Sequence, residues 1–219
     1  MSPPVAIAHY SDVLCVWAYI AQIRIDELRH QFGDRIAIET RFCSVFPDAR
    51  GKLSKAWAAR GGFPAYRAHV ESVVARFDHV ALHADVWAAT VPTTSATAHA
   101  CIKAAAIACD PGADVSLAWQ LRLAFFRDGR DISRLEVQLA VAEELGLSSS
   151  AIRAQLDAGT AWAAVLHDYE DAVADRVMGS PTLLLNERRQ TLYGNVGYKI
   201  IEANVLELLE GRGGQASWC

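Results

Sequence analysis

The stretch VAIAHYSDVLCVWAYI, residues 5–20, contains a strand-to-helix junction around which the rest of the chain can be interpreted. In its first half apolar residues alternate with small ones, which is typical of a short buried strand that ends near Asp12. In its second half apolar residues recur at helical spacing and continue until Gly33, a common helix stop. The sequence therefore predicts a strand followed at once by a helix over about residues 15–31, with Cys15 at the junction.

The strand pattern occurs in two further places. Residues 35–45, closed by Pro47, alternate again and complete a β-α-β unit. Residues 182–185 and 190–194, separated by a short turn, read as two more strands, and a final helix is expected over residues 198–209. Because crossover connections are right-handed and short turns join neighbouring strands, the first pair should be parallel and the last pair an antiparallel hairpin.

Between these strands, residues 48–177 follow helical periodicity. Ser133 and Glu136 are interpreted as a capping box at the start of one helix, and Thr160 as the cap of another. The expected helices cover residues 64–83, 93–109, 135–145, 149–157 and 160–175.

Together these elements predict an α/β protein with a thioredoxin fold, β-α-β … β-β-α, that carries a large all-helical insertion. The thioredoxin-like domain is assigned to residues 1–47 and 178–211, and the inserted helical domain to residues 48–177. Residues 212–219 are expected to form a flexible tail.

Composition excludes several classes of function. The chain has 219 residues, a formal net charge of −4, 52% hydrophobic and 21% charged residues, as expected of a globular protein with a sizeable core. It has no block of Lys or Arg, so neither nucleic acid nor an anionic membrane surface is an expected partner. The longest nearly apolar run, residues 13–21, is shorter than the roughly 18 residues of a membrane-spanning helix. The first residues do not resemble a signal peptide, so we expect a cytoplasmic protein.

A reduced state is expected for most of the cysteines in that compartment, so the question is which thiol is chemically active. Cys15 stands where a helix N-terminus should lower the pKa of its thiol and increase the thiolate fraction. The alternative is that Cys15 is a small buried apolar residue, as free cysteines often are. The five cysteines are Cys15, Cys43, Cys101, Cys109 and Cys219.

Three motifs, in this order along the chain, resemble the DsbA-like thioredoxin superfamily, in particular its cytoplasmic FrnE-type branch. Residues 11–20, SDVLCVWAYI, resemble the active-site stretch, and residues 177–182, VMGSPT, resemble the family's cis-proline loop. Residues 123–132 and 142–147 are similar to its helical-domain signature.

The resemblance implies roles for individual residues. Cys15 would be the nucleophile. Trp17, at the start of the helix beside it, is expected to line the site or the interface with the helical insertion, and core packing is its alternative role. Pro181 would be cis and would present the backbone of Ser180 to an extended substrate. Asp12 matches the family's acidic position, for which a surface salt bridge or a cap is the alternative role.

Two positions depart from the family pattern. Ala18 replaces the second cysteine, so the pair that forms an intramolecular disulfide is absent, and Val16 replaces a proline. The expected function is therefore a thiol-disulfide oxidoreductase with Cys15 as its single nucleophile, acting on a protein or small-molecule thiol or disulfide. Glutathione is the expected resolving thiol and co-substrate, with Cys43 as the internal alternative, and no tightly bound cofactor is expected.

Related 2-hydroxychromene-2-carboxylate isomerases and kappa-class glutathione transferases suggest a second function. In these enzymes a serine occupies a position near that of Cys15, and glutathione is bound at positions that correspond here to Ser180 and Asn195. A glutathione-dependent isomerase or transferase is thus the alternative activity, and a redox-inactive thioredoxin-like binding protein is the third candidate. No metal site is expected, since His79 and His83 lack a third ligand in the sequence nearby. The apolar helical insertion is compatible with a homodimer.

Overall fold

A four-stranded sheet forms the centre of the thioredoxin-like part. The computed structural model describes residues 3–210. The strands are β1 (Val5–Ser11), β2 (Ile36–Phe42), β3 (Thr182–Leu185) and β4 (Gln190–Tyr193), in the spatial order β2-β1-β3-β4. β1 is parallel to β2 and antiparallel to β3, while β3 and β4 form an antiparallel hairpin. The predicted β-α-β and β-β-α units and their pairing are confirmed.

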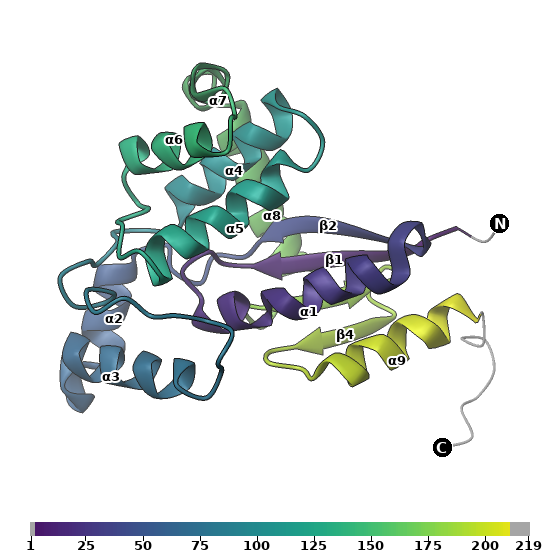
Figure 1. Cartoon of the computed structure of the whole chain (residues 1–219), viewed down its shortest axis with the longest axis horizontal. Helices are drawn as coiled ribbons and strands as arrows, with labels where there is room; N and C mark the ends of the chain where they lie inside the picture. Colours follow the sequence, from purple (N-terminus) through teal and green to yellow (C-terminus); the bar gives the residue numbers. More distant parts are fainter. Residues whose placement is uncertain (1–2, 211–219) are drawn as a thin grey trace.

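Two helices cover one face of this sheet. α1 (Val16–Phe32) and α9 (Tyr198–Leu209) lie in front of the strands in Figure 1. Leu28 of α1 and Val205 of α9 are fully buried in one apolar cluster with Ile7 and Leu185 of the strands. Burial of these side chains fixes α1 against the sheet, so the start of α1 is held at the end of β1.

The remaining helices lie between β2 and β3 in the sequence and form a second layer beside the sheet (Figure 1). α4 packs against α5, α7 and α8, and its alanines at positions 98, 104 and 105 are fully buried, which lets neighbouring helices approach closely. These helices are α2 (Ala49–Ala56), α3 (Gly62–Val74), α4 (Ala96–Ala108), α5 (Ala113–Phe126), α6 (Leu135–Glu144), α7 (Ser149–Asp157) and α8 (Thr160–Ala174). Short 3-10 turns cover Gly33–Arg35 and Ala58–Arg60.

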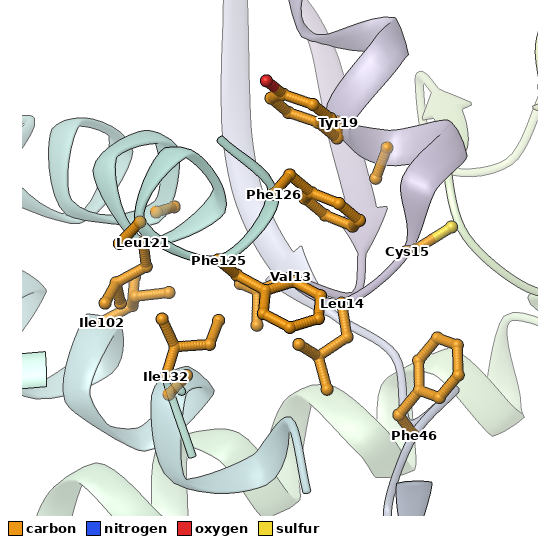
Figure 2. Close-up of a cluster of buried hydrophobic side chains, with 14 of the residues drawn as sticks. Val13, Leu14, Cys15, Tyr19, Phe46, Ile102, Leu121, Phe125, Phe126 and Ile132 are labelled. Atoms are coloured by element: carbon orange, nitrogen blue, oxygen red, sulfur yellow. The ribbon is translucent and has the colours of Figure 1, made fainter. Parts of the chain in front are cut away.

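The loop between β1 and α1 is embedded in the core of the helical layer. Val13 and Leu14 are fully buried, and Figure 2 shows them against Phe125 and Phe126 of α5. In the same view the sulfur of Cys15 points away from this cluster. The helical layer therefore shapes the segment that carries Cys15.

Several predicted details of the helices are wrong. The helix expected over residues 64–83 ends at Val74, because residues 75–95 leave the helix as turns whose apolar side chains still pack on the core. The capping box is absent: α6 begins after Arg134, and the Ser133 hydroxyl donates to the Asp131 carboxylate instead. Gly159, not Thr160, precedes α8.

Other predictions are incomplete or lie outside the structure. The sequence pattern indicates neither α2 nor α5, and β2 ends at Phe42, before the expected residue 45. The domain boundaries at residues 47 and 177 stay a prediction, and the tail with Cys219 lies outside the described residues. Among residues 3–210 no helix has both the length and the apolar character needed to cross a bilayer.

Candidate active site

Cys15 is the N-cap residue of α1, as its position in the sequence predicts. Its backbone N–H donates to the Asp12 carbonyl (3.1 Å), which closes the turn from the strand to the helix. The side chain is 7% exposed, and its thiol donates to the Ser180 carbonyl over 3.2 Å. The residue before Pro181 thus faces the sulfur, and the Ser180–Pro181 peptide bond is cis.

The prediction that the helix N-terminus gives the Cys15 thiol a lowered pKa is wrong. Burial raises the pKa of its thiol above the ordinary value, and the nearby negative charge of Asp12 raises it further. Hydrogen bonds from the Ser180 side chain and from the N–H groups of Ala18 and Trp17 act in the opposite direction. Cys15 does lie at a helix N-terminus, which lowers the pKa of its thiol. The cost of removing the thiolate from water raises the pKa by more.

Asp12 is a buried centre of hydrogen bonds rather than a surface residue. Its carboxylate is fully buried and accepts from the Leu14 N–H (2.9 Å) in the Cys15 loop. It also accepts from the N–H groups of Val45 (3.1 Å) and Phe46 (3.0 Å) and from the Ser95 hydroxyl (2.7 Å). One carboxylate therefore joins the Cys15 loop to the segment after β2 and to the start of α4.

The Asp12 backbone and a buried histidine hold the same loop from other sides. The Asp12 N–H donates to the Ser180 hydroxyl oxygen (2.9 Å), which ties the loop to the proline segment. His99 Nε2 accepts from the Val13 N–H (3.2 Å), so Nδ1 carries the proton and donates to the Tyr169 hydroxyl (2.8 Å). Burial lowers the pKa of His99 to about 4, and the imidazole is neutral at pH 7.

A buried cation completes this layer. Arg122 of α5 is 2% exposed, and its guanidinium donates to the Ser11 hydroxyl over 2.8 Å. Burial lowers the pKa of Arg122 to about 10, while the negative charge of Asp12 acts to raise it. Arg122 and Asp12 therefore place opposite charges behind the thiol.

Cys15 opens onto a cavity of about 590 Å³. Trp17, Ser180 and Cys43 line the same cavity, so the structure brings together three residues that the sequence singled out beside Cys15. Trp17 also packs edge-on against Phe77, with ring centroids 6.3 Å apart.

Two predicted site residues lie elsewhere. Pro181 borders a separate small cavity of about 20 Å³, together with His9. The Asn195 side-chain oxygen accepts a hydrogen bond from the Arg24 guanidinium, and Asn195 does not line the Cys15 cavity. Ala18 is 1% exposed, so this position of α1 is closed to solvent.

Cys43 follows β2 and is 5% exposed. Burial raises the pKa of its thiol, and the negative charge of Asp12 raises it further. Cys15, Cys43, Cys101 and Cys109 are free cysteines that form no disulfide within the described residues. Within residues 3–210 no group of three or more His, Cys, Asp or Glu side chains is arranged to hold a metal ion.

Sequence reasoning missed part of the cavity wall. Lys52, Tyr66 and His69 come from α2 and α3, and Tyr169 and Tyr193 come from α8 and β4. None of them belongs to a motif, and only the folding of distant segments brings them to Cys15. The alternation of strand residues does place Tyr193 in a strand, but it does not indicate the cavity.

Comparison with known proteins agrees with this architecture. A family model described as a DSBA-like thioredoxin domain matches residues 6–205. A probable DsbA oxidoreductase from Streptomyces coelicolor has a similar structure, with a TM-score of 0.75, 18% identity, and coverage of 98% of this chain and 93% of that chain. Comparison with curated proteins gave no match.

Two further similar structures bear other descriptions. The cytosolic disulfide reductase DsbM from Pseudomonas aeruginosa, in a structure with GSH, gives a TM-score of 0.69 at 18% identity, covering 92% of this chain and 99% of that chain. A 2-hydroxychromene-2-carboxylate isomerase gives 0.66 at 16% identity, covering 97% of this chain and 100% of that chain. At these identities the likeness concerns the fold, whereas the family model spans most of the sequence. This chain belongs to the DSBA-like thioredoxin domain family.

Proposed function

We propose that this protein is a thiol-disulfide oxidoreductase in which Cys15 is the single nucleophile and glutathione resolves the intermediate. The observation that carries the proposal is the position of the Cys15 sulfur, which lies on the wall of a cavity and 3.2 Å from the Ser180 carbonyl. An extended substrate bound along the Ser180 backbone would place its own sulfur beside Cys15.

The reaction follows from the chemistry of one thiol. The Cys15 thiol loses its proton to solvent, the thiolate attacks a substrate disulfide, and a mixed disulfide forms while the other half of the substrate leaves as a thiolate. A glutathione thiolate then attacks the substrate sulfur of the mixed disulfide, so that a glutathione–substrate disulfide forms, the bond to Cys15 breaks and Cys15 leaves as a thiolate. Because burial raises the pKa of Cys15, exchange should be slow at neutral pH until a bound substrate supplies hydrogen bonds to the sulfur.

An external resolving thiol fits the surroundings of Cys15. Position 18, one helical turn further on, is an alanine that is 1% exposed. Cys43 lines the same cavity, but burial raises the pKa of its thiol, which disfavours the thiolate that resolution needs. The similar DsbM is described as cytosolic and has a structure with GSH, which supports glutathione as the thiol and the cytoplasm as the compartment.

One observation favours a glutathione-dependent isomerase or transferase as a second candidate. In the resting site Cys15 is a protonated thiol that donates a hydrogen bond. A neutral thiol of this kind could donate to the sulfur of bound glutathione without forming a disulfide. A similar fold occurs in the 2-hydroxychromene-2-carboxylate isomerase.

Mass spectrometry after incubation with oxidised glutathione separates these functions. We expect a glutathione adduct on Cys15 in the wild type and in Cys43→Ser, no adduct at that site in Cys15→Ser, and release of the adduct by reduced glutathione. A Cys15–Cys43 disulfide in place of the adduct would overturn the external resolving step. Tight binding of reduced glutathione without any adduct would support the isomerase or transferase. Absence of both adduct and binding would leave a redox-inactive binding protein.

A further inference from the structure

The cavity at Cys15 has an unusual charge composition. The chain has 25 acidic residues and a net charge of −4, yet no Asp or Glu of the described chain lines this cavity. The lining includes one ammonium group, that of Lys52, and the imidazole of His69. Asp12 lies behind the wall, fully buried, with its oxygens occupied by backbone and Ser95 donors. An anion in this cavity would thus meet a cation without facing a carboxylate.

The Lys52 ammonium group is held in place by the fold but retains N–H donors that can bind a ligand. It belongs to α2, whose first turn is capped by the Asp48 side chain. Its Nζ donates to the Val45 carbonyl (2.5 Å) and lies 5.1 Å from the centre of the Phe46 ring. An ammonium group has three N–H donors, so two remain for a ligand. Among residues 3–210 no carboxylate oxygen lies within 4.0 Å of Lys52.

The rest of the wall is apolar and aromatic. Val173 and Met178 border the cavity, and at 80% each they have the highest exposed fractions among the large hydrophobic side chains that the structure describes. Binding of an apolar group would cover them. The aromatic residues of the lining are Trp17, Phe46, Tyr66, Tyr169 and Tyr193.

We infer that the substrate of this site is a small disulfide that carries both a carboxylate and an apolar or aromatic group. The carboxylate binds Lys52, the apolar group packs against the aromatic wall, and the disulfide lies at Cys15. A cavity of about 590 Å³ is within the range of small-molecule sites. The inference rests on the proposed function of Cys15 and adds the class of substrate. In the reaction one S–S bond forms between Cys15 and half of the substrate, the substrate S–S bond breaks, the other half leaves as a thiolate, and the Cys15 proton passes to solvent.

Two aromatic disulfides that differ in charge provide the test. The probes are 5,5′-dithiobis(2-nitrobenzoate), which carries carboxylates, and 4,4′-dithiodipyridine, which is neutral at pH 8. Each releases a coloured thiol, so the rate of reaction is followed by absorbance. At low ionic strength we expect Lys52→Gln to lower the rate with the carboxylate-bearing dithiobenzoate probe about threefold to fivefold. The rate with the neutral dithiodipyridine probe should fall by less than about twofold. The effect is moderate because a partly solvated charge pair contributes a modest free energy.

Matched variants make the result specific. Lys55→Gln removes an exposed charge from the same helix but outside the cavity lining, so it should leave the ratio of the two rates unchanged. Loss of rate with both probes in Lys52→Gln, loss with neither, or an equal change of the ratio in Lys55→Gln would overturn the carboxylate site at Lys52. Cys15→Ser identifies the part of each rate that belongs to Cys15. Unchanged rates in that variant would instead overturn the proposed function, so the two failures are distinguishable.

Discussion

Replacement of the buried Asp12 carboxylate by an amide should weaken the fold and make Cys15 more acidic at the same time. In Asp12→Asn the amide carbonyl can take the place of Oδ2 and keep the hydrogen bonds from Val45, Phe46 and Ser95. The amide nitrogen then faces the Leu14 N–H, so two donors meet where a donor and an acceptor were paired. The change therefore combines one lost hydrogen bond with the loss of negative charge at three others.

The size of the effect follows from these contacts. A buried donor without a partner costs about 1–3 kcal/mol, and conversion of three charge-assisted hydrogen bonds to neutral ones costs about 1 kcal/mol each. The amide no longer requires the burial of a charge, which offsets part of this cost. We expect the free energy of unfolding to fall by about 2–4 kcal/mol, a loss that a domain with a stability of roughly 5–15 kcal/mol survives.

Urea unfolding at pH 7, followed by circular dichroism, measures this change. Ser95→Ala removes one of the four donors and should cost about 1–2 kcal/mol, while Asp157→Asn at the exposed end of α7 should change stability by less than about 0.5 kcal/mol. Alkylation of Cys15 against pH, resolved by peptide mass mapping, should move to lower pH in Asp12→Asn because the charge that raises the pKa of Cys15 is gone. A stability loss no larger than that of Asp157→Asn, or an alkylation profile that stays in place or moves to higher pH, would refute the reasoning.

Two other predictions concern stability in acid and a cysteine introduced at position 18. Burial lowers the pKa of His99 to about 4 and that of His9 to about 3, from an ordinary value of 6.5. As pH falls, the unfolded chain binds protons at these histidines before the folded chain does, so protonation favours unfolding. The free energy of unfolding is therefore highest above pH 6.5 and falls by about 3 kcal/mol or more per histidine as pH decreases toward 4 for His99 and 3 for His9. Urea midpoints measured from pH 7 to pH 4 should therefore decrease, and a flat profile would contradict the neutral buried state of both rings. In Ala18→Cys we expect a disulfide between Cys15 and the introduced thiol after oxidation, because the two positions are one helical turn apart. The disulfide is detected as a loss of two hydrogens in the intact mass. The same mass loss in the control variant Ala18→Ser would show that another cysteine pair is responsible.

Much of the fold could be predicted because its local signals are strong. The strand at residues 182–185 and the helices at 149–157 and 198–209 occur at the predicted residues, since turn residues and glycines mark their ends. The end of α3 was missed because the apolar stripe continues through Phe77 and Val80, which pack on the core from a turn. Spacing alone does not distinguish a helix from a turn that presents the same side chains.

The candidate site was predictable in position but not in energetics. The junction of β1 and α1 places Cys15 correctly, and the resemblance to the family indicates Ser180 as its neighbour. The predicted acidity of the thiol is wrong because it depends on burial by segments far away in the sequence, which no local pattern reports. For the same reason nothing around Asp12 indicates that its carboxylate binds Ser95, which is 83 residues later.

The long sequence separations around Cys15 have a consequence for the order in which the chain is synthesised. Cys15 is made early, whereas Ser180, the acceptor of its thiol hydrogen bond, follows 165 residues later. His99, which holds Val13, follows that residue by 86 positions. Until these segments leave the ribosome, Cys15 is surrounded by water and its thiol has the acidity of a cysteine in an unfolded chain. The nascent polypeptide therefore carries a more ionised and more accessible thiol than the finished protein, and it depends on the reducing environment in which it is made until folding encloses that thiol.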